Sequence, residues 1–332
     1  MSVIRCRFAP LRKNTTNCYI VSVPCTGVCD TIGAMGIARG ESSRRQGDRR
    51  SVAAPALLAA ALLAAAAAVV VWSMSPARTL GQLEHEEVSA FSHIRVRRGG
   101  DIRTLTFVRD NGQEVMQSRV NLAASHTLVS PYARAMFASY LYQPQPRRVL
   151  IVGLGGGAMV RFLTHHEPQV HIDAVEIDPA VVRLADDYFG VRSGGNVRVH
   201  TADGVAFVES TADRYDLIFM DAFLRPSSDT DTTGVPTRLK TQAFLGRLKQ
   251  ALAPGGVVAF NLNEHDSMAD DIAAVAAVFD HVAVYRCPPA NNSVVIASEG
   301  DTTDDEVRAR IDALDARFGG TLSFADVLRN RE

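Results

Sequence analysis

A run of glycines follows an apolar segment near the middle of the chain. Residues 149–157 read Val-Leu-Ile-Val-Gly-Leu-Gly-Gly-Gly, and the glycines include Gly153, Gly155 and Gly157. Glycine permits a sharp turn and a close approach of the backbone to a ligand, and a helix that starts behind such a turn presents its N-terminus there. A glycine run alone is also compatible with a tight turn used only for packing. Its context has to decide between packing and a nucleotide site.

Two acids at the ends of the next apolar segments supply that context. Glu176 ends Ala-Val-Glu-Ile-Asp-Pro (174–179), about twenty residues further on, where a carboxylate accepts hydrogen bonds from both hydroxyls of a ribose. Asp203 follows the third segment, in Thr-Ala-Asp-Gly (201–204), where an acid can accept a hydrogen bond from an adenine amino group. Taken singly, each acid is equally compatible with a solvated strand end or a helix cap. Together with the glycines, they predict an adenosyl-binding site.

The elements that would hold these residues alternate regularly from residue 147 onward. Near-continuous apolar strands are separated by segments of helical spacing. This alternation is typical of a mainly parallel sheet with helices on both faces, whose ligand lies beyond the carboxyl ends of the strands. We therefore predict an α/β, Rossmann-like domain over 130–300, followed by C-terminal helices over 301–332. Its seven predicted strands are 149–153, 171–176, 197–200, 217–221, 257–261, 282–285 and 293–297.

Short alternating segments precede this domain. Residues 93–97 and 104–108 alternate between apolar and polar side chains, and Gly99-Gly100 and Asn111-Gly112 supply turns. The pattern predicts a small β-hairpin domain over 86–124.

The N-terminal part of the chain reads differently. Residues 1–51 lack periodicity and predict a disordered leader, whereas 52–72 carry no charge. About 21 helical residues span roughly 31 Å, the thickness of a bilayer core. We therefore predict a transmembrane or signal-anchor helix over 52–74 and a single-pass protein of the cell membrane. A cleaved signal peptide and a non-inserted helix in a cytoplasmic protein are the alternatives.

Composition excludes several classes of protein. With 332 residues, 47% of them apolar, the chain is long enough to fold around a real core. A formal net charge of −1 provides no global basic field for a phosphate backbone, so we expect no nucleic-acid partner. Four of the five cysteines fall in the first thirty residues, and no cysteine and histidine set has zinc spacing, so we expect no metal.

The later strands separate two classes of nucleotide enzyme. A dinucleotide dehydrogenase shares the glycine run and the acid after the second strand, but no second nucleotide-binding half is visible here. Instead, Asp221 ends the fourth strand in Leu-Ile-Phe-Met-Asp-Ala-Phe (217–223), and a polar loop follows as far as Pro236.

At this point the chain resembles the spermidine synthase (polyamine aminopropyltransferase) family, over about residues 86–300. The resemblance rests on the hairpins, the glycine run, Val-Glu-Ile-Asp-Pro, Ala-Asp-Gly, Tyr-Asp-Leu-Ile-Phe-Met-Asp (215–221) and Leu-Ala-Pro-Gly-Gly-Val (252–257). The segment 234–241 is most similar to the bacterial, membrane-associated members. The resemblance implies the fold of class I S-adenosylmethionine-dependent methyltransferases. It also implies decarboxylated S-adenosylmethionine as the co-substrate and Asp221 as the catalytic base. The cofactor contacts that it implies are Gln117, Gly153, Gly155, Glu176 and Asp203, and we expect Gly157 of the same glycine run to be a further contact.

The residues expected to bind the amine acceptor differ from those of the family. Gly156 stands where the family has an aspartate in the glycine loop, and Ala133 stands where it has a glutamate. A polyamine carries several ammonium groups, and each needs a carboxylate or carbonyl partner once water is excluded. Replacement acids could come from Asp229 or Asp231 in the loop, or from Glu264 and Asp266 after the fifth strand; Tyr132 could line the acceptor site.

Three functions remain open from the sequence. The leading hypothesis is the transfer of an aminopropyl group from decarboxylated S-adenosylmethionine to a small-molecule amine, as in polyamine biosynthesis. The alternatives are a methyltransferase that uses S-adenosylmethionine itself, which the lost acids favour, and a non-catalytic, membrane-anchored nucleotide-binding protein. The oligomeric state is open, with a homodimer as one option.

Overall fold

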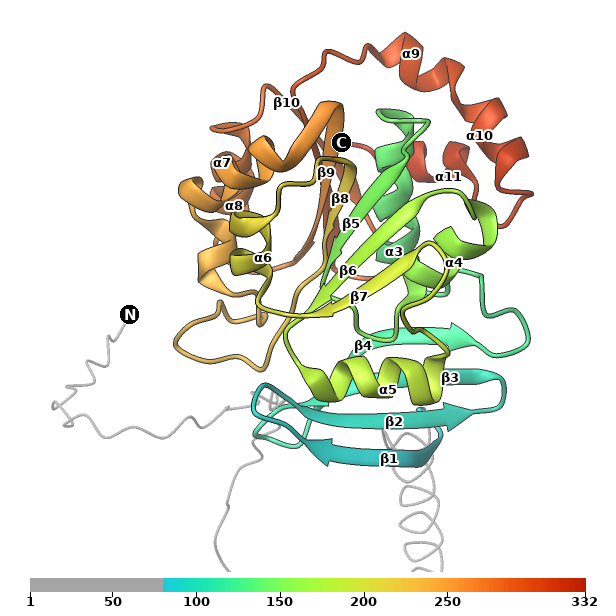
Figure 1. The fold of residues 1–332 in the computed structure, drawn as a ribbon, viewed down its shortest axis with the longest axis vertical. Coiled ribbons are helices and arrows are strands. Elements are labelled where there is room, and N and C mark those ends of the chain that lie inside the picture. Colours follow the sequence, from blue (N-terminus) through green and yellow to red (C-terminus); the bar gives the residue numbers. More distant parts are fainter. Residues whose placement is uncertain (1–79) are drawn as a thin grey trace, which may run out of the picture. The chain divides into compact units, whose positions relative to one another are not determined.

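Two sheets organise the part of the chain that the computed structural model describes, residues 80–332 (Figure 1). A four-stranded antiparallel sheet, in the order β1-β2-β3-β4, comes first in the chain. A seven-stranded sheet follows, in the order β10-β11-β9-β8-β5-β6-β7. All described residues belong to one compact unit of the chain.

The antiparallel sheet is a meander of three successive hairpins and packs against one helix of the larger domain. Its strands are β1 (Gln82–Val88), β2 (His93–Gly99), β3 (Ile102–Val108) and β4 (Glu114–Asn121). Gly100 and Gly112 have positive φ angles in the turns after β2 and β3, which explains why glycine stands there. Alternate apolar residues, such as Ile94 and Leu105, pack on Leu184 and Phe189 of α5 (Pro179–Phe189). This contact fixes the hairpin sheet beside the carboxyl ends of the parallel strands of the larger sheet.

The larger sheet confirms the predicted seven strands and their mainly parallel arrangement. Six strands run in the same direction, and only β11, which lies between β9 and the edge strand β10, is antiparallel to its neighbours. The strands are β5 (Arg148–Val152), β6 (His171–Glu176), β7 (Val197–Thr201), β8 (Tyr215–Met220), β9 (Leu252–Asn263), β10 (His281–Arg286) and β11 (Asn292–Ser298).

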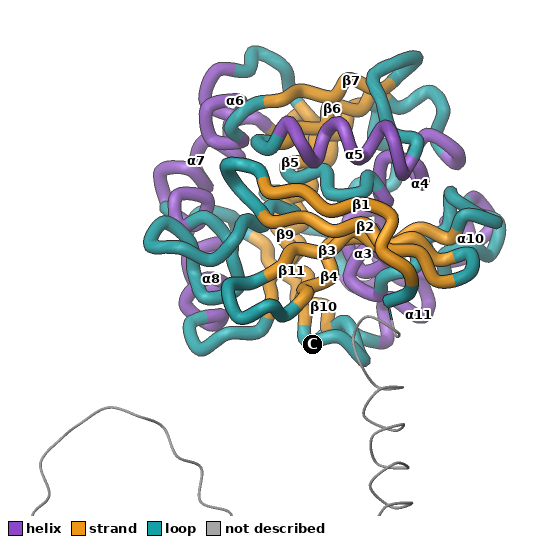
Figure 2. Tube along the Cα trace, turned by 90° about the horizontal axis from the view of Figure 1, so that it is seen from below, coloured by secondary structure: helices purple, strands orange, loops and turns teal. Residues whose placement is uncertain are grey.

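Helices bury both faces of this sheet, which is why its strands are apolar at successive positions. Val149 and Ile151 of β5 face one core, whereas Leu150 and Val152 face the other. Figure 2 shows α4, α10 and α11 on one side of the strands and α6, α7 and α8 on the opposite side. The first set comprises α3 (Pro131–Met136), η1 (Phe137–Leu141), α4 (Ala158–His166), α9 (Asp304–Ala309), α10 (Ile311–Arg317) and α11 (Phe324–Arg329). The second comprises α6 (Gly204–Ser210), η2 (Thr237–Lys240), α7 (Gln242–Ala251) and α8 (Met268–Ala276).

The direction of the winding reverses between β5 and β8. From β5 the chain moves outward to β6 and β7, and it then returns to place β8 on the other side of β5. The loops that follow β5 and β8 therefore diverge and leave a crevice at the carboxyl ends of these strands. At Gly153 the backbones come so close that a β-carbon would lie 2.1 Å from the carbonyl oxygen of Asp221.

The predicted membrane association is contradicted. The leader at 1–51 and the apolar segment at 52–74 lie outside the described residues. Within residues 80–332, no helix is long and apolar enough to cross a bilayer. The longest helix there, α5, has 11 residues, which corresponds to roughly 16 Å against the roughly 30 Å of a bilayer core.

Candidate active site

A cavity of about 880 Å³ opens at the carboxyl ends of the parallel strands, where the winding reverses. The hairpin sheet forms one wall, the glycine loop and the ends of β6 and β7 form another, and the loop after β8 covers it. Six of the seven residues predicted to bind or react lie on its surface, although they come from five separate segments. They are Gln117, Gly153, Gly155, Glu176, Asp203 and Asp221.

Gly157 is the exception among the predicted cofactor residues. It is the residue before α4 and has a φ of +66°, but it does not line the cavity. A β-carbon at this position would meet the side chain of Val191 at 2.7 Å. A cofactor contact at Gly157 therefore stays a prediction, and the proximity of Val191 provides a packing reason for glycine at this position.

Glu176 is buried at the end of β6 and holds the glycine loop in place. Its carboxylate accepts hydrogen bonds from the backbone N–H groups of Leu154 and Asp178, both at 3.0 Å. Burial raises the pKa of Glu176, and these backbone donors oppose the rise because they favour the charged form. The carboxylate is thus fixed relative to the loop while it still faces the cavity.

Asp203 combines the two roles that the sequence could not separate. One carboxylate oxygen caps α6 by accepting a hydrogen bond from the backbone N–H of Ala206 at 3.0 Å, and the residue also lines the cavity. The other oxygen forms an ion pair with Arg238, which comes from the loop after β8. The guanidinium of Arg238 is 63% exposed, so the pair is open to exchange with water or with a ligand.

Asp221 lies directly after β8, on the floor of the cavity. Its Oδ1 accepts a hydrogen bond from Nδ2 of Asn261 at 2.8 Å. Withdrawal from water raises the pKa of Asp221 to about 7, and the charge of Glu176 adds to this rise. Hydrogen bonds from Asn261 and Tyr132 limit it. A carboxyl group with a pKa near 7 is suited to take a proton at neutral pH.

Tyr132 connects the hairpin sheet to this floor. Its hydroxyl lies 3.1 Å from the backbone oxygen of Gln117 and also within hydrogen-bonding reach of Asp221, so its single proton is shared between these two acceptors. Burial and the neighbouring carboxylate raise the pKa of Tyr132, so the hydroxyl stays protonated as a donor.

Three asparagines beside Asp221 were not predicted from the sequence. Nδ2 of Asn292, on β11, donates to Oδ1 of Asn261 at 2.9 Å and also to Oδ1 of Asn263. Asn261 in turn donates to Asp221, so a chain of side-chain amides fixes the carboxylate. The alternation of Asn261 and Asn263 at the end of an apolar strand was a usable signal, because polar side chains there face the ligand end of the sheet.

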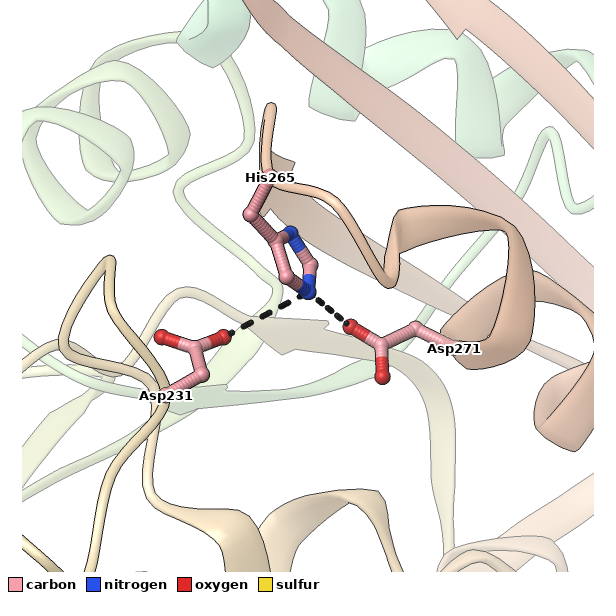
Figure 3. Close-up of side chains that lie close together, drawn as sticks. All are labelled: Asp231, His265 and Asp271. Atoms are coloured by element: carbon pink, nitrogen blue, oxygen red, sulfur yellow. Dashed lines mark ion pairs between the residues drawn. The ribbon is translucent and has the colours of Figure 1, made fainter. Parts of the chain in front are cut away.

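The proposed replacement acids divide into two groups. Asp229 lines the cavity, whereas Asp231 and the acids after β9, Glu264 and Asp266, do not. Asp231 and Asp271 both bind the ammonium of Lys240. Figure 3 shows His265 between these two carboxylates; its Nε2 lies 3.0 Å from Asp271 and 3.8 Å from Asp231.

This charged cluster serves the covering loop. Asp231 also accepts hydrogen bonds from backbone N–H groups of residues 233–235. The carboxylates already have the lysine ammonium as their cation, so we assign the cluster to holding the loop after β8 against α8 rather than to a metal.

Comparisons with known proteins identify the family. The model for the spermine/spermidine synthase domain matches residues 134–300, half of the chain. A polyamine aminopropyltransferase of Vibrio vulnificus is 32% identical over 218 residues, which cover 64% of this chain and 71% of that protein. Another, from Chromobacterium violaceum, is 31% identical over 72% of this chain and 89% of its own length.

A methyltransferase is also similar over a shorter region. The human eEF1A lysine and N-terminal methyltransferase is 35% identical over 45% of this chain and 22% of its own length. The structure of human methyltransferase-like protein 13 in complex with SAH superposes with a TM-score of 0.53 at 28% identity, covering 57% of this chain and 92% of that one.

The same fold occurs in a probable spermidine synthase from Corynebacterium glutamicum. The superposition has a TM-score of 0.58 at 21% identity and covers 72% of this chain and 95% of that one. The structure therefore has the fold of class I S-adenosylmethionine-dependent methyltransferases, as the sequence predicted. With a matching family model and two relatives that align over most of their length, the chain belongs to the spermine/spermidine synthase family.

Proposed function

We propose that this protein is an aminopropyltransferase that moves the aminopropyl group of decarboxylated S-adenosylmethionine to an amine. The observation that carries the proposal is the position of Asp221, a carboxyl group with a pKa of about 7 on the floor of the cavity that Gly153, Glu176 and Asp203 also line. It is one of the few side chains there that can take a proton at neutral pH.

The donor lies along the glycine loop in this proposal. Glu176 receives the ribose hydroxyls; its oxygens each have a second lone pair beyond the backbone hydrogen bonds that they accept. Asp203 receives the adenine amino group once the exposed Arg238 moves aside. Gln117 closes the site from the hairpin sheet.

The reaction needs one proton acceptor and good alignment. The nitrogen of the acceptor attacks the methylene carbon next to the sulfonium, and a C–N bond forms as the C–S bond breaks. The bonding electrons pass to sulfur, which leaves as the neutral thioether methylthioadenosine, and the proton of the amine passes to Asp221. Most of the rate enhancement comes from holding the nucleophile in line and from removing its proton.

Binding and product analysis test this function together. The full-length protein is titrated calorimetrically with decarboxylated S-adenosylmethionine, S-adenosylmethionine and methylthioadenosine, and the products formed with amines are separated by chromatography. We expect tighter binding of the decarboxylated donor and release of methylthioadenosine. Asp221→Asn should lower kcat by at least about a hundredfold while the affinity for the donor stays within about twofold. Full activity of this variant would remove Asp221 as the base.

Methyl transfer is the second candidate, because the human methyltransferase is 35% identical over 45% of this chain and because Gly156 and Ala133 leave the loop and α3 without acids. It predicts preference for S-adenosylmethionine and formation of S-adenosylhomocysteine. If the protein binds none of the three ligands, only a non-catalytic role remains.

A homodimer through the hairpin sheet is also part of the proposal. Among the described residues, the exposed large apolar side chains are Leu83, Val88 and Met116, all on this sheet. β1 is its edge strand and offers unpaired backbone groups to a second copy. Sedimentation equilibrium of the wild type and of Val88→Lys tests this, since a lysine on the edge should favour the monomer.

A further inference from the structure

The charges around the cavity are nearly balanced, which restricts the acceptor. Its lining contains four acidic residues and three arginines, so its formal charge is −1. The acids are Glu176, Asp203, Asp221 and Asp229, and the arginines are Arg109, Arg225 and Arg238. A ligand with several positive charges would meet little compensating charge here.

Most of this negative charge is already engaged. Glu176 is held by backbone donors and Asp203 by Arg238, whereas Asp221 is the proton acceptor in the proposed reaction. Asp229 is left, and it lies exposed on the loop after β8, where a carboxylate remains solvated and is a weak partner for an ammonium group.

The surroundings of Asp221 are neutral. The side chains that extend from it along the sheet are the amides of Asn261, Asn263 and Asn292, which hydrogen-bond to one another. The side-chain carbonyl oxygens of Asn261 and Asn263 each accept a hydrogen bond from the amide of Asn292. The floor can therefore hold one amine for reaction, but it lacks a carboxylate for a second ammonium group.

A guanidinium on the hairpin wall is unengaged. Arg109 follows β3 and lines the same cavity as Asp221. Within residues 80–332 its side chain has neither a hydrogen bond nor an ion pair, whereas Arg238 pairs with Asp203 and Arg225 lies 3.6 Å from Asp110. An arginine with free donors binds carboxylates well, in two-point geometry, and repels ammonium groups.

Charge counting then selects the acceptor. The decarboxylated donor carries two positive charges, on its sulfonium and its ammonium group. A diamine whose attacking nitrogen is neutral adds one more, so donor and acceptor together carry a charge of +3. An amino acid whose attacking nitrogen is neutral adds a carboxylate instead, so donor and acceptor together carry a charge of +1. This charge balances the formal charge of −1 on the cavity lining. We infer that the acceptor is an amine with a remote carboxylate, an ω-amino acid, and that Arg109 binds this carboxylate. The inference rests on the aminopropyl transfer proposed above.

Acceptors of equal length that differ only at the remote end test it. With full-length protein and decarboxylated S-adenosylmethionine, kcat/KM for methylthioadenosine release is compared for 4-aminobutyrate, butylamine and 1,4-diaminobutane, and for homologues one and two carbons longer. We expect the amino acid to exceed the diamine by at least about tenfold at the best length. A diamine preferred at every length overturns the inference while it leaves aminopropyl transfer intact.

Variants then assign the carboxylate partner. Arg109→Gln should lower the ratio of kcat/KM for the amino acid to kcat/KM for butylamine about tenfold. Arg109→Lys should restore part of this ratio. Arg192→Gln is the matched control, because it removes the same charge from an exposed site outside the cavity. An unchanged ratio in Arg109→Gln overturns the role of Arg109.

Two further outcomes separate the inference from its premise. If Arg109→Gln weakens the binding of S-adenosylmethionine but not of its decarboxylated form, the arginine serves the carboxylate of a donor, and the acceptor assignment fails. If the protein releases no methylthioadenosine with any amine, calorimetric titration of 4-aminobutyrate and 1,4-diaminobutane into its complex with methylthioadenosine still tests which acceptor binds. Binding of the diamine alone overturns the inference, and binding of the amino acid alone upholds it after the proposed reaction has failed.

Discussion

Replacing Asn261 by leucine should move the pH dependence of the reaction without abolishing it. Leucine has the same number and branching of side-chain heavy atoms as asparagine but removes the Nδ2 donor that lies 2.8 Å from Oδ1 of Asp221. This hydrogen bond lowers the pKa of Asp221, which burial raises to about 7. The variant should therefore have a base with a higher pKa.

The size of the change follows from the charge of the acceptor. A hydrogen bond to a charged group contributes about 1.5–3 kcal/mol, and one pKa unit corresponds to about 1.4 kcal/mol, so the pKa should rise by about one to two units. Asp221 must be ionised to accept a proton, so activity increases with pH through its pKa. The acidic limb should move from about 7 to about 8–9, and kcat/KM at pH 7 should fall about 5- to 50-fold.

The assay is methylthioadenosine release, with kcat/KM measured from about pH 5.5 to pH 10. The acceptor amine titrates identically in both proteins, so the ratio of variant to wild type isolates the enzyme group. Asn263→Leu is the matched control, since Asn263 belongs to the same strand and accepts from Asn292 but does not contact Asp221. The reasoning would be refuted if the acidic limb of the pH profile stayed near pH 7 in Asn261→Leu, or if kcat/KM fell by the same factor at all pH values.

Other predictions concern the scaffold of the site. Gly153→Ala should destabilise the fold by about 2–4 kcal/mol in urea denaturation, because it combines a φ of +97° with a β-carbon 2.1 Å from the carbonyl oxygen of Asp221. Gly246→Ala, in open space on α7, should instead stabilise it by about 1 kcal/mol. Lys240→Met leaves two carboxylates close together, so limited proteolysis should cut the loop after β8 faster than in wild type. The pKa of Glu114, lowered to about 2 by its arginine partners, provides roughly 3 kcal/mol of stability above pH 4.5 that should disappear between about pH 4.5 and 2; Glu114→Gln should abolish this dependence.

The sequence alone determined the architecture of the larger domain. Strands buried on both faces must be apolar at successive positions, and this local pattern revealed the seven strands and their alternation with helices. Gly153, Glu176, Asp203 and Asp221 were found because each lies at the end of a strand or within two residues after it. In a parallel sheet such positions converge at one edge, whatever the details of packing.

Tertiary structure decided what each of these side chains touches. Arg238 reaches Asp203 across 35 residues of chain, and Asn292 reaches Asn261 across 31, only because the covering loop and the antiparallel β11 return to the same edge. Gly157 looked like its neighbours in the glycine run, yet it packs against Val191. Periodicity reports which face a residue occupies. Contacts between distant segments depend on strand register and on the path of loops, and a single sequence carries little local record of either.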